Sequence, residues 1–196
     1  MIEIELPEGT SPEFRLAVDS LRSATLREEL SIEQITAPAK LATHAVAFAA
    51  NVDSKIADVS SDLGTGRFVL LWDTNEQETW QSRFRVICFA KSPLETDIGA
   101  DEQISDVSWA WLNEALSNRN AKFTNAAGTA TRVISSGYGS LSGQSDHAEL
   151  EMRASWSPTD ADAKSHFEAW QDLVCIMSGF PNLPAGVSSF EHKNSR

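Results

Sequence analysis

The segment from Ala148 to Trp156 alternates between apolar and polar side chains. A period of two matches a β-strand, in which successive side chains point to opposite faces of the sheet. One face of this strand is therefore expected in the core and the other in contact with solvent. The apolar set after Ala148 is Leu150, Met152, Ala154 and Trp156, and the polar set is Glu149, Glu151, Arg153 and Ser155.

Four further segments have the composition of strands, and polar loops join the first three of them. Because such loops suit antiparallel neighbours, we expect these three strands to form an antiparallel meander. A shorter strand over residues 30–35 also fits the pattern, and Pro38 must end it or lie at a sheet edge. The four longer segments are residues 45–52, 67–72, 80–91 and 128–136.

Three segments carry apolar side chains at helical spacing. The first has Thr10 and Glu13 in capping-box spacing, with Pro12 in its first turn. The second is expected to start at Ser105 or Asp106. The third is expected to start between residues 160 and 162 and to end at Gly179. The apolar stripes are Phe14, Ala17, Val18 and Leu21; Trp109, Leu112 and Leu116; and Phe167, Trp170, Val174 and Met177.

This order of elements predicts an α+β fold: helix, three strands, helix, two strands and helix, with an antiparallel sheet of about five strands. A chain of 196 residues, of which 41% are hydrophobic, can bury a core of ordinary size. We therefore expect a single domain over residues 1–184. Residues 185–196 have Val187 and Phe190 as their only large apolar side chains and are expected to be a frayed tail.

The net charge of −12 disfavours broad contact with nucleic acid or with an anionic lipid surface. No segment reaches the roughly 18 uninterrupted apolar residues of a membrane helix. The acidic, alternating start Met-Ile-Glu-Ile-Glu-Leu differs from the basic start of a secretory signal. These features predict a cytoplasmic protein without a nucleic-acid or membrane partner.

No combination of side chains predicts a metal site, a cofactor or a catalytic residue. None of the four histidines lies three or four residues from another histidine or a cysteine. Cys88 and Cys175 lie within apolar patterns and are expected to be buried thiols. The glycine-rich residues 137–143 contain no lysine and precede no helix, so a hairpin loop fits them better than a phosphate site.

Four runs stand out in the sequence: Gly-Arg-Phe-Val-Leu-Leu-Trp-Asp at residues 66–73, Val-Ser-Trp-Ala-Trp-Leu at 107–112, Leu-Glu-Met-Arg-Ala-Ser-Trp at 150–156 and Ala-Trp-Gln-Asp-Leu-Val-Cys at 169–175. These runs resemble an actinobacterial family, the domain-of-unknown-function family numbered three thousand. The resemblance covers nearly the whole chain. The family has no assigned activity, so the resemblance implies no catalytic residue.

The order of elements is also similar to that of the type III secretion chaperones, which are small acidic dimers that cradle segments of other proteins. This second resemblance is topological and carries no sequence motif. It implies a chaperone-like fold, a protein or peptide partner, and a homodimer.

Half of the ten arginines fall within expected strands. Because strand side chains alternate between faces, Arg83 and Arg85 are expected on one face, and Arg153 on the polar face of its strand. One interpretation is a solvated face with Arg–Glu pairs between strands. The other is a surface that binds an anionic ligand or an acidic protein segment. The five arginines are Arg67, Arg83, Arg85, Arg132 and Arg153.

Of the six tryptophans, Trp109, Trp156 and Trp170 lie on apolar stripes and are expected in the core, whereas packing explains Trp80 and Trp111 less well. We therefore consider these two residues candidates for an interface.

The leading hypothesis is a non-enzymatic protein-binding or chaperone-like module that forms a homodimer and uses its sheet face or a helix stripe as the contact surface. The alternative is a small-molecule enzyme or sensor that binds an anionic ligand between sheet and helices, where Arg85, Arg132 or Arg153 would orient the anion.

Overall fold

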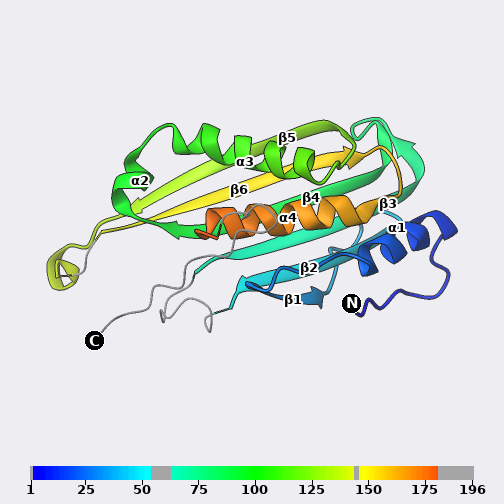
Figure 1. Ribbon diagram of the computed structural model, residues 1–196, viewed down its shortest axis with the longest axis horizontal. Coiled ribbons are helices and arrows are strands. Elements are labelled where there is room, and N and C mark those ends of the chain that lie inside the picture. The colour runs from blue at the N-terminus through cyan, green and yellow to red at the C-terminus, as the bar shows by residue number, and fades with distance from the viewer. Residues whose placement is uncertain (1, 54–62, 144–145, 181–196) are drawn as a thin grey trace, which may run out of the picture.

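The computed structural model describes residues 2–53, 63–143 and 146–180 (Figure 1). The expected frayed tail at residues 185–196 lies outside these ranges. The described helices are α1 (Pro12–Arg22), α2 (Thr96–Ala100), α3 (Ile104–Asn118) and α4 (Ala163–Met177). The described strands are β1 (Leu30–Ile35), β2 (His44–Val52), β3 (Thr65–Gln77), β4 (Ser82–Leu94), β5 (Phe123–Ser135) and β6 (His147–Pro158).

The six strands form one antiparallel sheet in the order β1-β2-β3-β4-β6-β5. The α+β class and the meander of β2, β3 and β4 are confirmed. The short strand β1 is present and makes the sheet six-stranded rather than five-stranded. The last strand, β6, lies between β4 and β5, so β5 becomes an outer strand.

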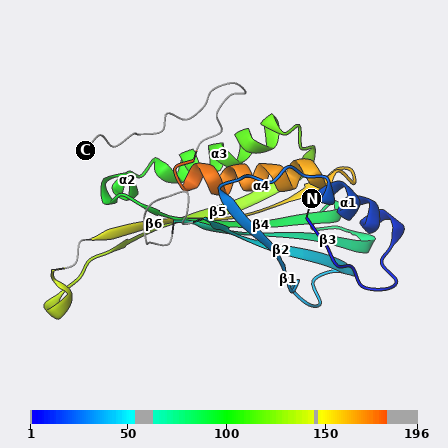
Figure 2. The same cartoon turned by 60° about the horizontal axis from the view of Figure 1, so that its bottom comes forward.

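The long helices α1, α3 and α4 lie on the same face of the sheet, as Figure 2 shows. Side chains at even positions of the central strands point to these helices, and Phe48, Phe68, Cys88 and Ala154 share one cross-strand row in the core. No described helix covers the other face, which we call the open face. In the described part of the chain, no helix is long and apolar enough to cross a membrane.

Helix α4 is the central helix, and every residue from Ala163 to Met177 except Lys164 and Ile176 is buried. Its outward side is polar and lies beneath residues 24–29, the connection from α1 to β1 (Figure 2). The main-chain N–H of Thr25 donates to Glu168 at 2.8 Å, and that of Arg27 donates to the Gln171 side chain at 2.9 Å. Side-chain acceptors on α4 therefore bind main-chain N–H groups of a connection that is itself neither helix nor strand.

A buried ion-pair network joins the same segments. Asp172 of α4, which is fully buried, accepts hydrogen bonds from Arg27 at 3.3 Å and from Arg119 at 2.6 and 2.9 Å. Arg119, at the end of α3, also pairs with Glu168 at 3.0 Å. Two arginines thus compensate two buried carboxylates and link α3, α4 and the α1–β1 connection.

Two helix starts differ from expectation. Ser11, rather than Thr10, caps α1 by accepting a hydrogen bond from the Phe14 N–H at 3.2 Å. The Thr10 hydroxyl donates instead to the Pro7 carbonyl at 2.6 Å, so it is already engaged. Helix α3 begins at Ile104, ahead of Ser105, and has no side-chain cap.

Trp170 and Val174 of α4 lie directly against Gly66 of β3. An added Cβ at Gly66 would lie 3.0 Å from Trp170 and 2.5 Å from Val174, so no larger residue fits between β3 and α4. The Trp170 indole N–H also donates to the main-chain carbonyl of Phe89 at 3.2 Å. These contacts set the distance between α4 and the centre of the sheet.

A buried tryptophan–histidine pair joins β6 to α4. The Trp156 indole N–H donates to His166 Nδ1 at 2.9 Å, and both side chains are fully buried. The other ring nitrogen of His166, Nε2, has no hydrogen-bond partner among the described residues. Burial therefore lowers the pKa of His166 from 6.5 to about 4, and the imidazole is neutral at physiological pH.

Candidate functional site

The open face presents one cross-strand row that combines two arginines with an aromatic ring. Register places Arg67 of β3 beside Phe89 of β4, and Phe89 beside Arg153 of β6. The row continues to Ala49 of β2 and to Thr129 of β5. Neighbouring strands hold these positions about 5 Å apart, so Arg67 and Arg153 occupy the positions on either side of Phe89 in the middle of the sheet.

The two arginines of the row differ in their contacts. The Arg153 guanidinium carbon lies 5.2 Å from the Phe89 ring centroid, and its Nε donates to Glu151. Arg67 is exposed, and no ion pair involves it among the described residues. The Arg67 guanidinium is thus available to an external carboxylate or phosphate.

Ion pairs and apolar side chains surround the row. Lys91 of β4 pairs with Glu149 of β6 at 2.9 Å, so part of the open face is a solvated set of cross-strand charges. Next to Phe89 on the same face, Val69 and Ile87 are in register with each other, and Ile87 is 36% exposed. The face therefore offers both charge and exposed apolar surface.

Arg85 lies on the same face but is buried. Its Nη1 donates to the Asn125 carbonyl at 2.8 Å and to Ser157 at 3.0 Å, and its Nη2 donates to Ser155 at 2.6 Å. All three acceptors are neutral, and burial lowers the pKa of the guanidinium. These hydrogen bonds hold β4 to the β5 and β6 strands and leave Arg85 only 9% exposed.

Arg83 does not share a face with Arg85, contrary to the expectation from alternation. Its guanidinium donates to Glu13 of α1 at 2.8 Å and to the Thr74 carbonyl at 2.6 Å, and it lies over the Trp72 ring. The β3–β4 ladder shifts register between Trp72 and Gln77. Alternation therefore no longer fixes the direction of a side chain at this end of the hairpin.

Arg132 points to the helix side of β5, since its register partner is the core residue Leu150. Its Nη1 donates to the carbonyl of Asp101 at 2.9 Å, at the end of α2. A cation at a helix C-terminus satisfies carbonyls that have no partner in the helix. The structure thus gives Arg132 a place beside α2, away from the other strand arginines.

Trp80 and Trp111 are both half-buried and lie far from the row. Trp80 is in the β3–β4 turn, where its carbonyl accepts a hydrogen bond from Ser157 at 2.6 Å. Trp111 lies on α3 and packs against the core. Neither ring is part of the open-face row.

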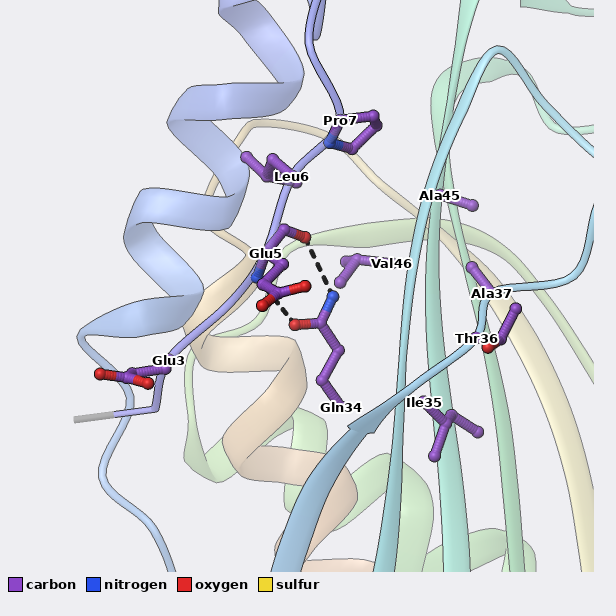
Figure 3. A pocket seen from close by; sticks show the side chains of 10 residues that line it. All are labelled: Glu3, Glu5, Leu6, Pro7, Gln34, Ile35, Thr36, Ala37, Ala45 and Val46. Carbon is purple, nitrogen blue, oxygen red and sulfur yellow. Dashed lines mark hydrogen bonds between the residues drawn. The ribbon is translucent and has the colours of Figure 1, made fainter.

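A groove of about 750 Å³ lies between the N-terminal segment and β1 (Figure 3). The Gln34 side chain lines this groove and pairs with the main chain of Glu5: it accepts from the N–H at 2.8 Å and donates to the carbonyl at 3.0 Å. Glu3 and Glu5 are the ionisable residues that line the groove. The groove therefore does not suit an anionic ligand. Its lining is Glu3, Glu5, Leu6, Pro7, Gln34, Ile35, Thr36, Ala37, Ala45 and Val46.

Metal-ligating and nucleophilic groups do not gather in the structure. In the ranges that it describes, no cluster of three or more histidine, cysteine, aspartate or glutamate side chains could hold a metal ion. Cys88 and Cys175 are buried and unpaired with each other, and burial raises the pKa of each thiol to about 12. Both thiols are therefore protonated at physiological pH.

The structure brings Arg67 and Arg153 together, places Arg85 nearby in a buried position, and separates Arg83 and Arg132. Sequence reasoning missed Phe89 as the centre of the row. The sequence contained a signal for Phe89, because it lies two residues after Ile87 and four residues after Arg85. Alternation therefore places it on the face opposite to Cys88. Arg85, Arg132 and Arg153, the arginines expected to orient an anion between sheet and helices, do not converge.

Comparison with known proteins gives one positive finding. No curated protein and no solved structure matches the chain, so the expected similarity to type III secretion chaperones stays a prediction. A family model described as a protein of unknown function, DUF3000, matches residues 10–188. Because the match spans most of the sequence and agrees with the resemblance of its runs, the chain belongs to the DUF3000 family.

Proposed function

We propose that the chain is a non-enzymatic, cytoplasmic protein-binding module whose contact surface is the open face of the sheet. The observation that carries this proposal is the row in which Arg67 and Arg153 flank Phe89. Arginine and aromatic side chains, including phenylalanine, are enriched at protein interfaces, and the half-buried Phe89 lies between the two arginines.

The chemistry of the row indicates the kind of partner. An acidic side chain of the partner would pair with Arg67, which has no carboxylate partner among the described residues. Apolar side chains of the partner would pack on Phe89, Ile87 and Val69. The proposed partner is therefore a protein segment that combines acidic and apolar residues.

The test is a double charge reversal, Arg67→Glu with Arg153→Glu, in the full chain. The matched control is Arg15→Glu, because Arg15 is exposed on α1, on the helix side of the sheet. Partners are captured from a lysate of the native organism, purified, and titrated against each variant.

We expect the double variant to weaken binding of the purified partner by at least about 100-fold, since two central charges change sign, and the control to bind as the unchanged chain does. Equal partner affinity for all three proteins would refute the open face as the contact surface. Circular dichroism of each variant checks that the fold is retained.

A further inference from the structure

The two outer strands of the sheet differ in how their free edges are protected. Edge strands present unpaired main-chain N–H and C=O groups, and proteins usually shorten, charge or cover them. Strand β1 has six residues, and its Gln34 binds the N-terminal segment. Strand β5 has thirteen residues, none of them buried, and no described strand pairs with its outer side.

The regular part of β5 is residues 127–135, which form nine consecutive pairs with β6. A bulge precedes it, where Asn125 adopts a positive φ of 52° and the register shifts. The nine residues include no proline, lysine, aspartate or glutamate, and their only charge, Arg132, is directed to the α2 carbonyls. This edge therefore lacks the features that block the addition of another strand.

Exposed apolar side chains gather at the same edge. Four of the nine large apolar side chains that the described residues expose lie between Val133 and Leu141. Tyr138, in the turn that follows β5, is 82% exposed, and Ile98 of the neighbouring α2 is 44% exposed. Val133 is in register with Glu149 on the open face and Ile134 with the buried Ala148 on the helix side, so apolar surface is exposed on both sides of this edge. The four side chains are Val133, Ile134, Tyr138 and Leu141.

Charge favours a second copy of this chain as the occupant. Each copy carries a net charge of −12, so two copies repel over most of their surfaces. Residues 115–145 contain no aspartate or glutamate, although the whole chain has 28 such residues. Two acidic copies can thus meet along the β5 edge without opposing carboxylates from β5 itself.

A groove of about 680 Å³ beside β5 can receive the side chains of an added strand. It lies between β5 and the α2–α3 region and is lined by Gly99, Ala100, Glu102, Ser105, Ala130, Thr131, Arg132 and Ile134. A strand added to β5 would direct alternate side chains into this groove, on the helix side of the sheet.

We propose that two copies of the chain associate by antiparallel pairing of their β5 strands over residues 127–135. The product is one continuous sheet with six strands from each copy. A twofold axis perpendicular to the sheet keeps the helices of both copies on the same side, so the two open faces form one surface. This inference does not depend on the open-face proposal, because it concerns the edge and not the face.

The first test is the mass of the purified full chain by size-exclusion chromatography with light scattering. We expect twice the chain mass of 21.4 kDa. The variant Thr131→Lys with Val133→Lys is expected to raise the dimer dissociation constant at least about tenfold, since lysines on an edge oppose strand pairing. The matched control, Ser31→Lys with Glu33→Lys on the β1 edge, stays dimeric.

A monomeric unchanged chain at submillimolar concentration would overturn the proposal, as would a Thr131→Lys, Val133→Lys variant that dimerises normally. Single cysteines at positions 129, 131 and 133 provide a second measurement, because Cys88 and Cys175 are buried and do not cross-link. Oxidation should produce a disulfide dimer at the position nearest the twofold axis, and no cross-link at any of the three positions refutes β5 pairing. These measurements need no partner protein, so a failure of the β5-pairing proposal can be distinguished from a failure of the open-face proposal.

Discussion

Replacement of His166 by glutamine tests how burial of a neutral imidazole contributes to stability. The folded protein holds the pKa of His166 at about 4, whereas the unfolded chain has the ordinary value of 6.5. The unfolded chain thus binds this proton more tightly. The stability that neutral His166 contributes is complete above pH 6.5, falls as the pH drops from 6.5 to 4, and is lost below that range.

The size of the effect follows from the two pKa values. Between pH 7 and pH 5 this single group should reduce the free energy of unfolding by about 2 kcal/mol. His166→Gln removes the titration but retains an acceptor for the Trp156 indole N–H. Carboxylates contribute equally to the pH dependence of the unchanged chain and of the His166→Gln variant. The difference between their changes in unfolding free energy therefore gives the contribution of His166.

The assay is urea unfolding followed by tryptophan fluorescence at pH 7 and pH 5. The unchanged chain should lose about 2 kcal/mol more than the His166→Gln variant over this interval. His147→Gln, which replaces an exposed histidine on β6, is the control and should behave as the unchanged chain. Parallel losses in the unchanged chain and in His166→Gln would refute the reasoning.

Three further substitutions test the packing of the helices by urea midpoint. Ser11→Ala should cost about 1 kcal/mol by removing the cap of α1, and an unchanged midpoint would contradict the cap. Gly66→Val should cost about 2 kcal/mol or more, because its Cβ would lie 2.5 Å from Val174; a native-like midpoint would show that α4 can move away. Asp172→Asn should cost about 3 kcal/mol, because two half-buried arginines each lose one charged partner; the exposed Asp19→Asn should cost less than about 0.5 kcal/mol.

Local patterns predicted the elements of the fold well. The alternation after Ala148 identified β6 and its buried face, because burial on one side of a sheet leaves a period of two in the sequence. The cap of α1 was misplaced by one residue, since Thr10 and Ser11 both suit a cap and only the Thr10 bond to Pro7 distinguishes them. The pairing of β6 between β4 and β5 depends on long-range contacts that no local pattern contains.

Predictions of the site succeeded where the ladder is regular and failed where it is not. Arg153 lies on the polar face of its strand, as alternation required. Arg83 was misplaced, because the register shift near Trp72 breaks the alternation from which its face was inferred. Arg132 had no alternating neighbours to indicate its face, and only the register with Leu150 shows that it points to the helices.

The place of α4 and β6 has a consequence for the order of folding. Both elements come late in the chain, yet β6 joins β5 to the meander and α4 provides the centre of the core. During synthesis, the meander and β5 leave the ribosome with apolar faces that have nothing to pack against until residues 147–177 follow. Folding of the core must therefore wait for residues 147–177 and depends on contacts distant in sequence, which makes it slow. In this interval the edge of β4 to which β6 will pair has unpaired main-chain N–H and C=O groups that another strand could bind.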